Sequence, residues 1–79
     1  MNVLLFGIAK DIVGTKELFV ESVSTIRTVR DLTDFLKSAY PELNKLRSLA
    51  IAVNSEYANM ETNISETDEI AIIPPVSGG

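Results

Sequence analysis

The residues best suited to chemistry stand at the end of the chain, where Pro74-Pro75-Val76-Ser77 leads into Gly78-Gly79. A terminal carboxylate has a reference pKa of about 3.3 to 3.7, so near neutral pH it is an anion and a poor electrophile. Coupling to a nucleotide phosphate would give an acyl-adenylate, a mixed anhydride that a sulfur or nitrogen nucleophile can attack. We therefore expect the acyl carbon of Gly79 to be the reactive centre, after activation by another protein.

The residue types before this carboxylate suit a thread that enters another protein. Gly78 and Gly79 have no Cβ, so their backbone can pass through a channel too narrow for other residues. Pro74 and Pro75 fix φ near −65° and favour an extended segment, which sets the direction in which the tail leaves the body. At about 3.3 Å per residue, residues 74–79 reach at most roughly 20 Å. The alternative is an inert end, because chain termini are often polar and glycine-containing.

The composition indicates one small globular domain that is not a self-sufficient enzyme. The chain has 79 residues, of which 46% are hydrophobic and 23% charged, as in folded domains. It contains no Cys and no His, which removes thiolate chemistry, the usual general base near neutral pH and the commonest metal ligand. We expect no permanently bound cofactor and no metal site.

The net charge indicates which kinds of partner the chain can bind, and the length of its apolar segments indicates whether it can span a membrane. A net charge of −4 disfavours nucleic acid and anionic membranes as partners. It favours a positively charged protein surface, or it serves solubility alone. The apolar run at residues 3–8 is too short to span a membrane and has no basic residues before it, so we expect a cytoplasmic protein.

Residues 2–7 are predicted to form a strand that is apolar on both faces. Val3 and Leu5 lie on one face, and Leu4 and Phe6 lie on the other. Such a strand is either central in a sheet or covered by a partner on its outer face. Phe6 therefore either packs in the core or faces another protein.

Residues 28–40 show the clearest helical pattern, with apolar residues recurring every three or four positions. Thr28 and Asp31 form a capping-box pattern at its start. Pro41 ends it, because the residue before a proline is disfavoured in the helical region. The predicted buried face consists of Val29, Leu32, Phe35, Leu36, Ala39 and Tyr40.

The remaining elements complete an α+β domain. Residues 8–13 are predicted to form a short helix that Gly14 ends, and residues 61–68 a polar loop. Further strands are predicted at residues 17–22, 49–53, 56–58 and 69–73. In the last strand, Ala71 and Ile73 share the face opposite to Ile70 and Ile72. We predict a mixed sheet of about five strands covered by one main helix, as a domain at 1–73 followed by a tail at 74–79.

These segments together resemble the ubiquitin-like β-grasp sulfur carriers, most closely the small subunits of molybdopterin synthases. The resemblance covers the whole chain and rests on Val3-Leu4-Leu5-Phe6-Gly7, Ala9-Lys10-Asp11-Ile12-Val13-Gly14, Thr28-Val29-Arg30-Asp31-Leu32, Val53-Asn54 and the run from Asp68 to Gly79. It implies that an E1-like activating enzyme adenylates Gly79 with ATP and magnesium, and that sulfur from a donor protein converts Gly79 to a thiocarboxylate.

The resemblance also implies a partner that receives the tail. The large synthase subunit would supply the catalytic side chains, and the thiocarboxylate would give its sulfur to cyclic pyranopterin monophosphate to make molybdopterin. A two-plus-two assembly is implied. In this family the carrier is a subunit that donates sulfur, without catalytic side chains of its own.

Residue roles follow from the resemblance by position. Gly79 would carry the acyl group, Gly78 would permit close threading, and Val76 and Ser77 would line the channel through backbone contacts. Pro74 and Pro75 would aim the tail.

Apolar side chains of the domain are implied to face the partner. Phe6 and Ile73 match partner-facing positions of the family, and Leu4 and Met60 are further candidates. The pair Ile72-Ile73 stands where some relatives have aromatic residues.

Three other functions are compatible with the same sequence. A ubiquitin-like modifier would use the same activation to form an isopeptide bond from Gly79 to lysines of other proteins. A thiamine-pathway sulfur carrier is a second alternative, although such carriers usually lack the double proline. The third is an interaction domain with an inert tail.

Overall fold

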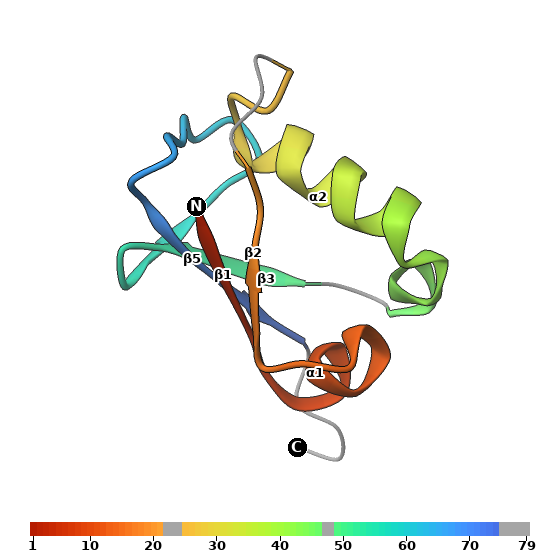
Figure 1. Ribbon diagram of the computed structural model, residues 1–79. Helices are drawn as coiled ribbons and strands as arrows, with labels where there is room; N and C mark the ends of the chain where they lie inside the picture. The colour runs from red at the N-terminus through yellow and green to blue at the C-terminus, as the bar shows by residue number, and fades with distance from the viewer. Residues whose placement is uncertain (22–24, 47–48, 75–79) are drawn as a thin grey trace.

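The computed structural model describes residues 1–21, 25–46 and 49–74, in which α2 crosses one face of a five-stranded mixed sheet (Figure 1). In chain order the elements are β1 (Asn2–Leu5), α1 (Gly7–Val13), β2 (Glu17–Phe19), α2 (Val29–Ala39), the 3₁₀ helix η1 (Pro41–Lys45), β3 (Ala50–Val53), β4 (Glu56–Ala58) and β5 (Glu69–Ile73). The predicted α+β class, with one main helix on a mixed sheet, is confirmed.

The first and last strands of the chain lie side by side at the centre of the sheet. The strand order is β2-β1-β5-β3-β4. The pair β1 and β5 is parallel, and the other three pairs are antiparallel. Because β1 and β5 run in the same direction, the end of β5, where the tail begins, lies beside the end of β1.

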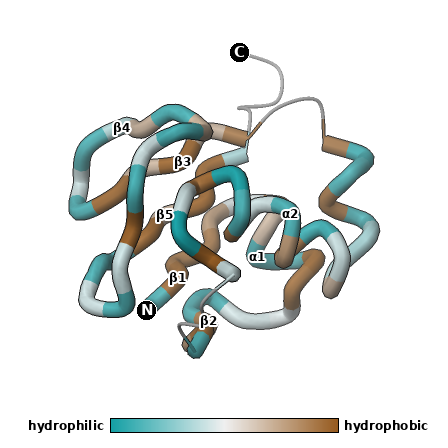
Figure 2. Tube along the Cα trace, turned by 90° about the horizontal axis from the view of Figure 1, so that it is seen from above, coloured by the Kyte–Doolittle hydropathy of each residue, from teal (hydrophilic) through white to brown (hydrophobic). Residues whose placement is uncertain are grey.

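The core lies between the sheet and α2. Val3 and Leu5 of β1 are buried, as are Ile70 and Ile72 of β5, and the register pairs Val3 with Ile70 and Leu5 with Ile72. The helix contributes the buried side chains of Val29, Leu32 and Leu36. Figure 2 shows hydrophobic segments of the central strands and of α2 toward the middle of the molecule. Burial of each large apolar side chain stabilises the fold by about 1.5 to 3 kcal/mol.

The predicted capping box at the start of α2 is confirmed. The Asp31 backbone N–H donates to Thr28 Oγ1 at 3.3 Å, and the Thr28 N–H donates to Asp31 Oδ2 at 3.1 Å. The same carboxylate accepts from the Arg27 N–H at 3.0 Å. This last bond is the main reason that the pKa of Asp31 lies below its ordinary value, because each donor favours the ionised carboxylate.

Two residues of the predicted helix face are exposed. Phe35 is 45% exposed and Ala39 is exposed as well. The buried stripe runs instead through Thr33, whose hydroxyl donates to the Val29 carbonyl at 2.8 Å and is thereby satisfied within the helix. A polar residue can occupy a buried helix position when a backbone carbonyl one turn earlier accepts its hydrogen bond. The prediction that Phe35 and Ala39 lie on the buried face was wrong.

Several boundaries also differ from the prediction. The first strand ends at Leu5, because Gly7 has φ +54° and begins α1. The second strand ends at Phe19 rather than at Ser22, which lies outside the described residues. The third begins at Ala50, one residue after the predicted start.

The segment after the main helix adds an element that was not predicted. Pro41 follows the end of α2, as expected, and is also the first residue of η1. A proline is tolerated there because the N–H of the first residue of a helix has no partner within the helix. This 3₁₀ helix buries Leu43 in the core.

Candidate functional site

The described part of the chain ends at the root of the tail. Pro74 follows β5 and is buried. A methyl group added to Gly7 would lie 3.2 Å from Cγ of Pro74, so Pro74 packs closely over the start of α1. The predicted threading residues at 75–79, including Gly78 and Gly79, lie outside the described residues. Their roles, and the boundary between domain and tail, stay predictions.

The sheet face opposite to α2 carries the apolar residues predicted to meet a partner. Leu4 of β1 pairs with Ala71 of β5, and the alternation of the strands places Phe6 and Ile73 one step further on the same face. Leu4 and Ile73 are half-buried, while Phe6 is 48% exposed. The alternative in which Phe6 packs in the core is therefore wrong. The contact of Phe6 and Ile73 with a partner stays a prediction.

This apolar surface continues across the sheet beyond the residues that the sequence indicated. Ala52 pairs with Ala71 on one side and with Tyr57 on the other, and Ala50 pairs with Ile73. Tyr57 is 79% exposed. We call this surface the outer face; it consists of Leu4, Phe6, Ala50, Ala52, Tyr57, Ala71 and Ile73. The sequence contains a signal for this extension of the outer face, namely the run of apolar residues at 49–53. A strand that is apolar on both faces needs both of its faces covered, one by the core and one by a partner.

Met60 lies apart from the outer face. Its side chain is partly buried and packs against the core, and its carbonyl accepts from the Arg30 N–H at 3.0 Å at the start of α2. Its predicted contact with a partner stays a prediction.

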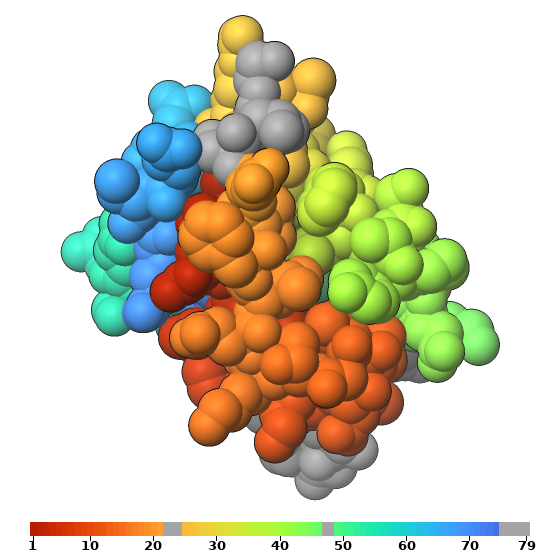
Figure 3. Space-filling model, in the orientation of Figure 1, coloured from red at the N-terminus to blue at the C-terminus, as the bar shows by residue number. Residues whose placement is uncertain are grey.

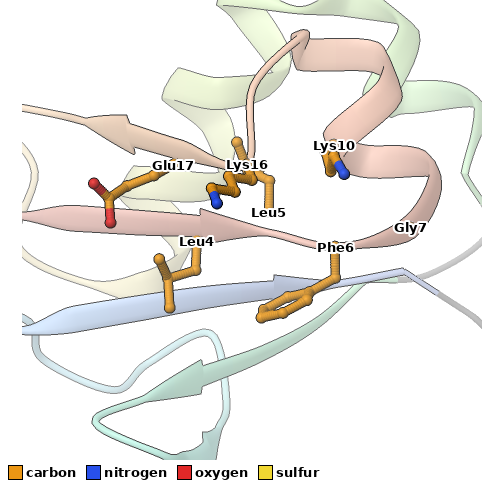
Figure 4. Close-up of a pocket in the computed structure, with 7 residues that line it drawn as sticks. All are labelled: Leu4, Leu5, Phe6, Gly7, Lys10, Lys16 and Glu17. Atoms are coloured by element: carbon orange, nitrogen blue, oxygen red, sulfur yellow. The ribbon is translucent and has the colours of Figure 1, made fainter.

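A hollow opens at the end of the outer face, beside Phe6 and the root of the tail. Its volume is about 450 Å³, and Figure 4 shows Leu4 and Phe6 pointing to the same side of β1 there. The hollow is lined by Leu4, Leu5, Phe6, Gly7, Lys10, Lys16 and Glu17. In the space-filling view, β1 appears as a narrow strip beside β2, next to the C-terminal strand (Figure 3).

Within residues 1–21, 25–46 and 49–74, no three His, Cys, Asp or Glu side chains gather in a way that would hold a metal ion. Over the same ranges, no helix is long and apolar enough to cross a membrane. The site is thus defined by an apolar sheet face and a buried tail root.

A five-stranded mixed sheet with parallel first and last strands, holding one main helix, is the ubiquitin-like β-grasp fold of the sulfur carriers. The profile of the ThiS family matches residues 3–79. The chain belongs to the ThiS family.

Relatives of known name match over nearly the whole length. The molybdopterin synthase sulfur carrier subunit of Dictyostelium discoideum is 38% identical over 81 residues, covering 99% of this chain and 94% of the relative. The solution structure of small archaeal modifier protein 1 from Methanosarcina acetivorans superimposes with a TM-score of 0.80 at 29% identity, covering 99% of this chain and 94% of that one.

One similar structure is part of a complex. It is the protein–protein complex of subunits 1 and 2 of the molybdopterin-converting factor from Helicobacter pylori 26695, with a TM-score of 0.66 and 25% identity, covering 99% of this chain and 96% of that chain. The resemblance to the β-grasp sulfur carriers that the sequence indicated is confirmed by the family and by the relatives.

Proposed function

We propose that this chain is the sulfur carrier of a molybdopterin synthase. Gly79 is adenylated, converted to a thiocarboxylate, and donates its sulfur to cyclic pyranopterin monophosphate to make molybdopterin. The observation that carries the proposal is the full-length similarity to the molybdopterin synthase sulfur carrier subunit of Dictyostelium discoideum, at 38% identity.

The chemistry follows from the state of the terminal carboxylate. An ionised carboxylate is a poor electrophile, so an activating enzyme with ATP and magnesium first joins it to the α-phosphate, and pyrophosphate leaves. Sulfide delivered by a donor protein then attacks the acyl carbon of Gly79, so that a C–S bond forms, the bond to the phosphate breaks and AMP leaves. The large subunit supplies the side chains for sulfur transfer, and this chain supplies the sulfur.

The outer face is the proposed docking surface for the large subunit, in a two-plus-two assembly. The complex of subunits 1 and 2 from Helicobacter pylori supports a large-subunit partner for a protein of this fold. The outer face lies next to the buried root Pro74, so a protein docked there is in reach of the tail. Phe6 and Ile73 are the proposed apolar anchors, because a few residues carry most of the affinity of an interface and burial of a large apolar side chain contributes about 1.5 to 3 kcal/mol.

Incubation of the purified chain with its activating enzyme, ATP, magnesium and a sulfur donor tests the activation step. Intact mass spectrometry is expected to show one oxygen replaced by sulfur, with the change located at Gly79 by fragmentation. A chain lacking Gly78 and Gly79 is the control and is expected to keep its mass. An unchanged mass of the full chain, with a donor and enzyme that are active on another carrier, would contradict the proposal.

The docking surface is tested by a pair of phenylalanines with nearly equal exposure. Phe6 on the outer face is 48% exposed and Phe35 on α2 is 45% exposed. Burial of the exposed half of Phe6 by a partner would contribute about 1 kcal/mol to the binding free energy. In the Phe6→Asp variant this contribution is lost, and burial of the new carboxylate adds a larger cost. We expect Phe6→Asp to weaken large-subunit binding by at least about tenfold. Phe35→Asp is expected to leave the affinity nearly unchanged in calorimetry, and equal effects would remove the outer face from the interface.

A second candidate function is protein modification, favoured by the similarity to small archaeal modifier protein 1. The same activated Gly79 would then form isopeptide bonds with lysines of other proteins. Immunoblots against the chain in its native cells distinguish the two. A ladder of larger conjugates that disappears when Gly79 is deleted supports a modifier, and a single band at the size of the free chain supports a dedicated sulfur carrier.

A further inference from the structure

The hollow beside the tail root combines an apolar floor with a basic rim. Leu4 and Phe6 contribute the apolar side chains from β1. Lys10 comes from α1, and Lys16 and Glu17 come from the start of β2. With a volume of about 450 Å³, the hollow is in the range of about 300 to 1,000 Å³ that is typical of ligand pockets, which leaves room for a large side chain.

The charge of this rim is opposite to that of the chain as a whole. The chain has a net charge of −4, but two lysines and one glutamate border the hollow, an excess of one positive charge. Within the described ranges, neither the Lys10 nor the Lys16 ammonium has a salt bridge or hydrogen bond. Both charges are thus available to a partner.

The position of the hollow connects it with the tail. Gly7 is part of its lining, and the same residue packs against Pro74, from which the tail leaves the body. A protein that receives the tail and covers the outer face therefore passes over this rim.

We propose that the hollow is a docking site for an acidic segment of the large subunit, with one apolar side chain between Leu4 and Phe6 and carboxylates at Lys10 and Lys16. This inference rests on the proposed function and names the chemistry of the partner. Apolar contact gives the affinity, and the two ammonium groups select a segment of negative charge and steer its approach.

A double charge reversal with a matched control tests the inference. Lys10→Glu with Lys16→Glu is compared with Lys37→Glu combined with Lys45→Glu. Both variants change the net charge equally. Lys10 lies in the last turn of α1 and Lys37 in the last turn of α2, so each pair loses one favourable interaction with an α-helix dipole. Lys45 lies in the last turn of the short 3₁₀ helix η1, so any further loss falls on the control and works against the expected difference. Lys37 and Lys45 line no part of the hollow.

Affinity for the purified large subunit is measured by calorimetry at low and high salt. One exposed ion pair changes affinity by up to about fivefold, and a reversal replaces each attraction by a repulsion. We expect the Lys10/Lys16 variant to bind about tenfold to a hundredfold more weakly at low salt than the Lys37/Lys45 control. The difference is expected to shrink near 1 M salt, where the screening length is about 3 Å. Equal affinities, or tighter binding by the Lys10/Lys16 variant, overturn the inference.

The chain's own tail is the competing occupant, because its terminal carboxylate is also an anion. NMR spectra of the free full chain and of a chain lacking Gly78 and Gly79 decide between them. Unchanged signals of the Leu4 methyl groups and the Lys10 side chain support an outside partner. Changed signals there assign the hollow to the tail and overturn the inference. Sulfur acquisition measured separately by mass spectrometry shows whether the proposed function holds when this inference fails.

Discussion

Asn54, in the β3–β4 turn, forms hydrogen bonds with residues at the start of β5, the strand that precedes Pro74. Its side-chain amide donates to Asp68 Oδ1 at 2.9 Å, and its side-chain oxygen accepts from the Glu69 N–H at 3.0 Å. Its own backbone N–H donates to the Glu69 carbonyl at 2.8 Å. The residue also has φ 51°, a left-handed conformation that Asn tolerates better than most residues. We predict that substitution of Asn54 destabilises the whole domain.

Two substitutions separate the hydrogen bonds from the backbone conformation. Asn54→Gly removes both side-chain hydrogen bonds, at about 0.5 to 1.5 kcal/mol each, while glycine adopts the positive φ freely. Asn54→Ala removes the same bonds and adds a left-handed cost of about 1 to 2 kcal/mol. We expect a loss of about 1 to 3 kcal/mol for Gly and about 2 to 5 kcal/mol for Ala. Each kcal/mol lowers the Tm of a domain of this size by about 4 to 8 °C.

Urea unfolding, followed by circular dichroism, measures both variants with the wild-type chain. The midpoint is expected to fall in the order wild type, Gly variant, Ala variant, with an unchanged slope. Equal midpoints for the Gly and Ala variants would refute the argument from the backbone, and a Gly variant as stable as wild type would refute the argument from the side chain.

The same substitution has a consequence for acid stability through Asp68. The pKa of Asp68 lies below its ordinary value of 3.8, first because Asn54 donates to its carboxylate and then because the Ser65 N–H donates at 2.8 Å. A carboxyl with a lowered folded pKa stabilises the protein above its unfolded pKa, and this contribution is lost as pH falls through the folded pKa. In Asn54→Ala, an NMR titration is expected to show the Asp68 pKa raised toward 3.8; an unchanged pKa would contradict the assignment.

Two further predictions concern the root of the tail and the start of the main helix. Gly7→Ala puts a methyl group 3.2 Å from Pro74 Cγ at φ +54°, whereas Gly14→Ala meets nothing within 4 Å at φ +90°. Both substitutions place alanine at a positive φ, but only Gly7→Ala adds a close contact with Pro74. Thermal unfolding is therefore expected to show a larger loss of stability for Gly7→Ala than for Gly14→Ala. The reverse order would contradict the close packing of Pro74. Thr28→Ala removes the side chain that accepts at the N-terminus of α2, and chemical unfolding is expected to show a loss of about 1 kcal/mol; unchanged stability would mean that water replaces the cap.

The strand alternation and the capping signals made most of the fold predictable from the sequence. Val3 and Leu5 face the core while Phe6 faces outward, as the period of two requires. Thr28 and Asp31 marked the start of α2 because only a few residue types satisfy the first N–H groups of a helix. The apolar character of both strand faces also indicated that the sheet has an outer face in need of cover.

The differences arose where tertiary packing overrides local pattern. Phe35 fits the helical period but is exposed, because the buried stripe runs through Thr33, which satisfies its hydroxyl within the helix. The predicted first strand extends to Gly7, because the sequence does not reveal that this glycine has a positive φ, of +54°. Tyr57 lies on the outer face because it pairs with Ala52 across the two-residue turn of the β3–β4 hairpin. A strand of three residues has too few positions for its sequence pattern to show which face is covered.

The most direct test of the central claim follows sulfur from the chain into the product. The chain is converted to its thiocarboxylate with isotopically labelled sulfur, mixed with the large subunit and cyclic pyranopterin monophosphate, and both the chain and the product are weighed by mass spectrometry. We predict that the label moves from Gly79 into the dithiolene of molybdopterin and that the chain returns to the mass of its carboxylate form. Unlabelled molybdopterin, or equal product from a chain lacking Gly78 and Gly79, would contradict the account.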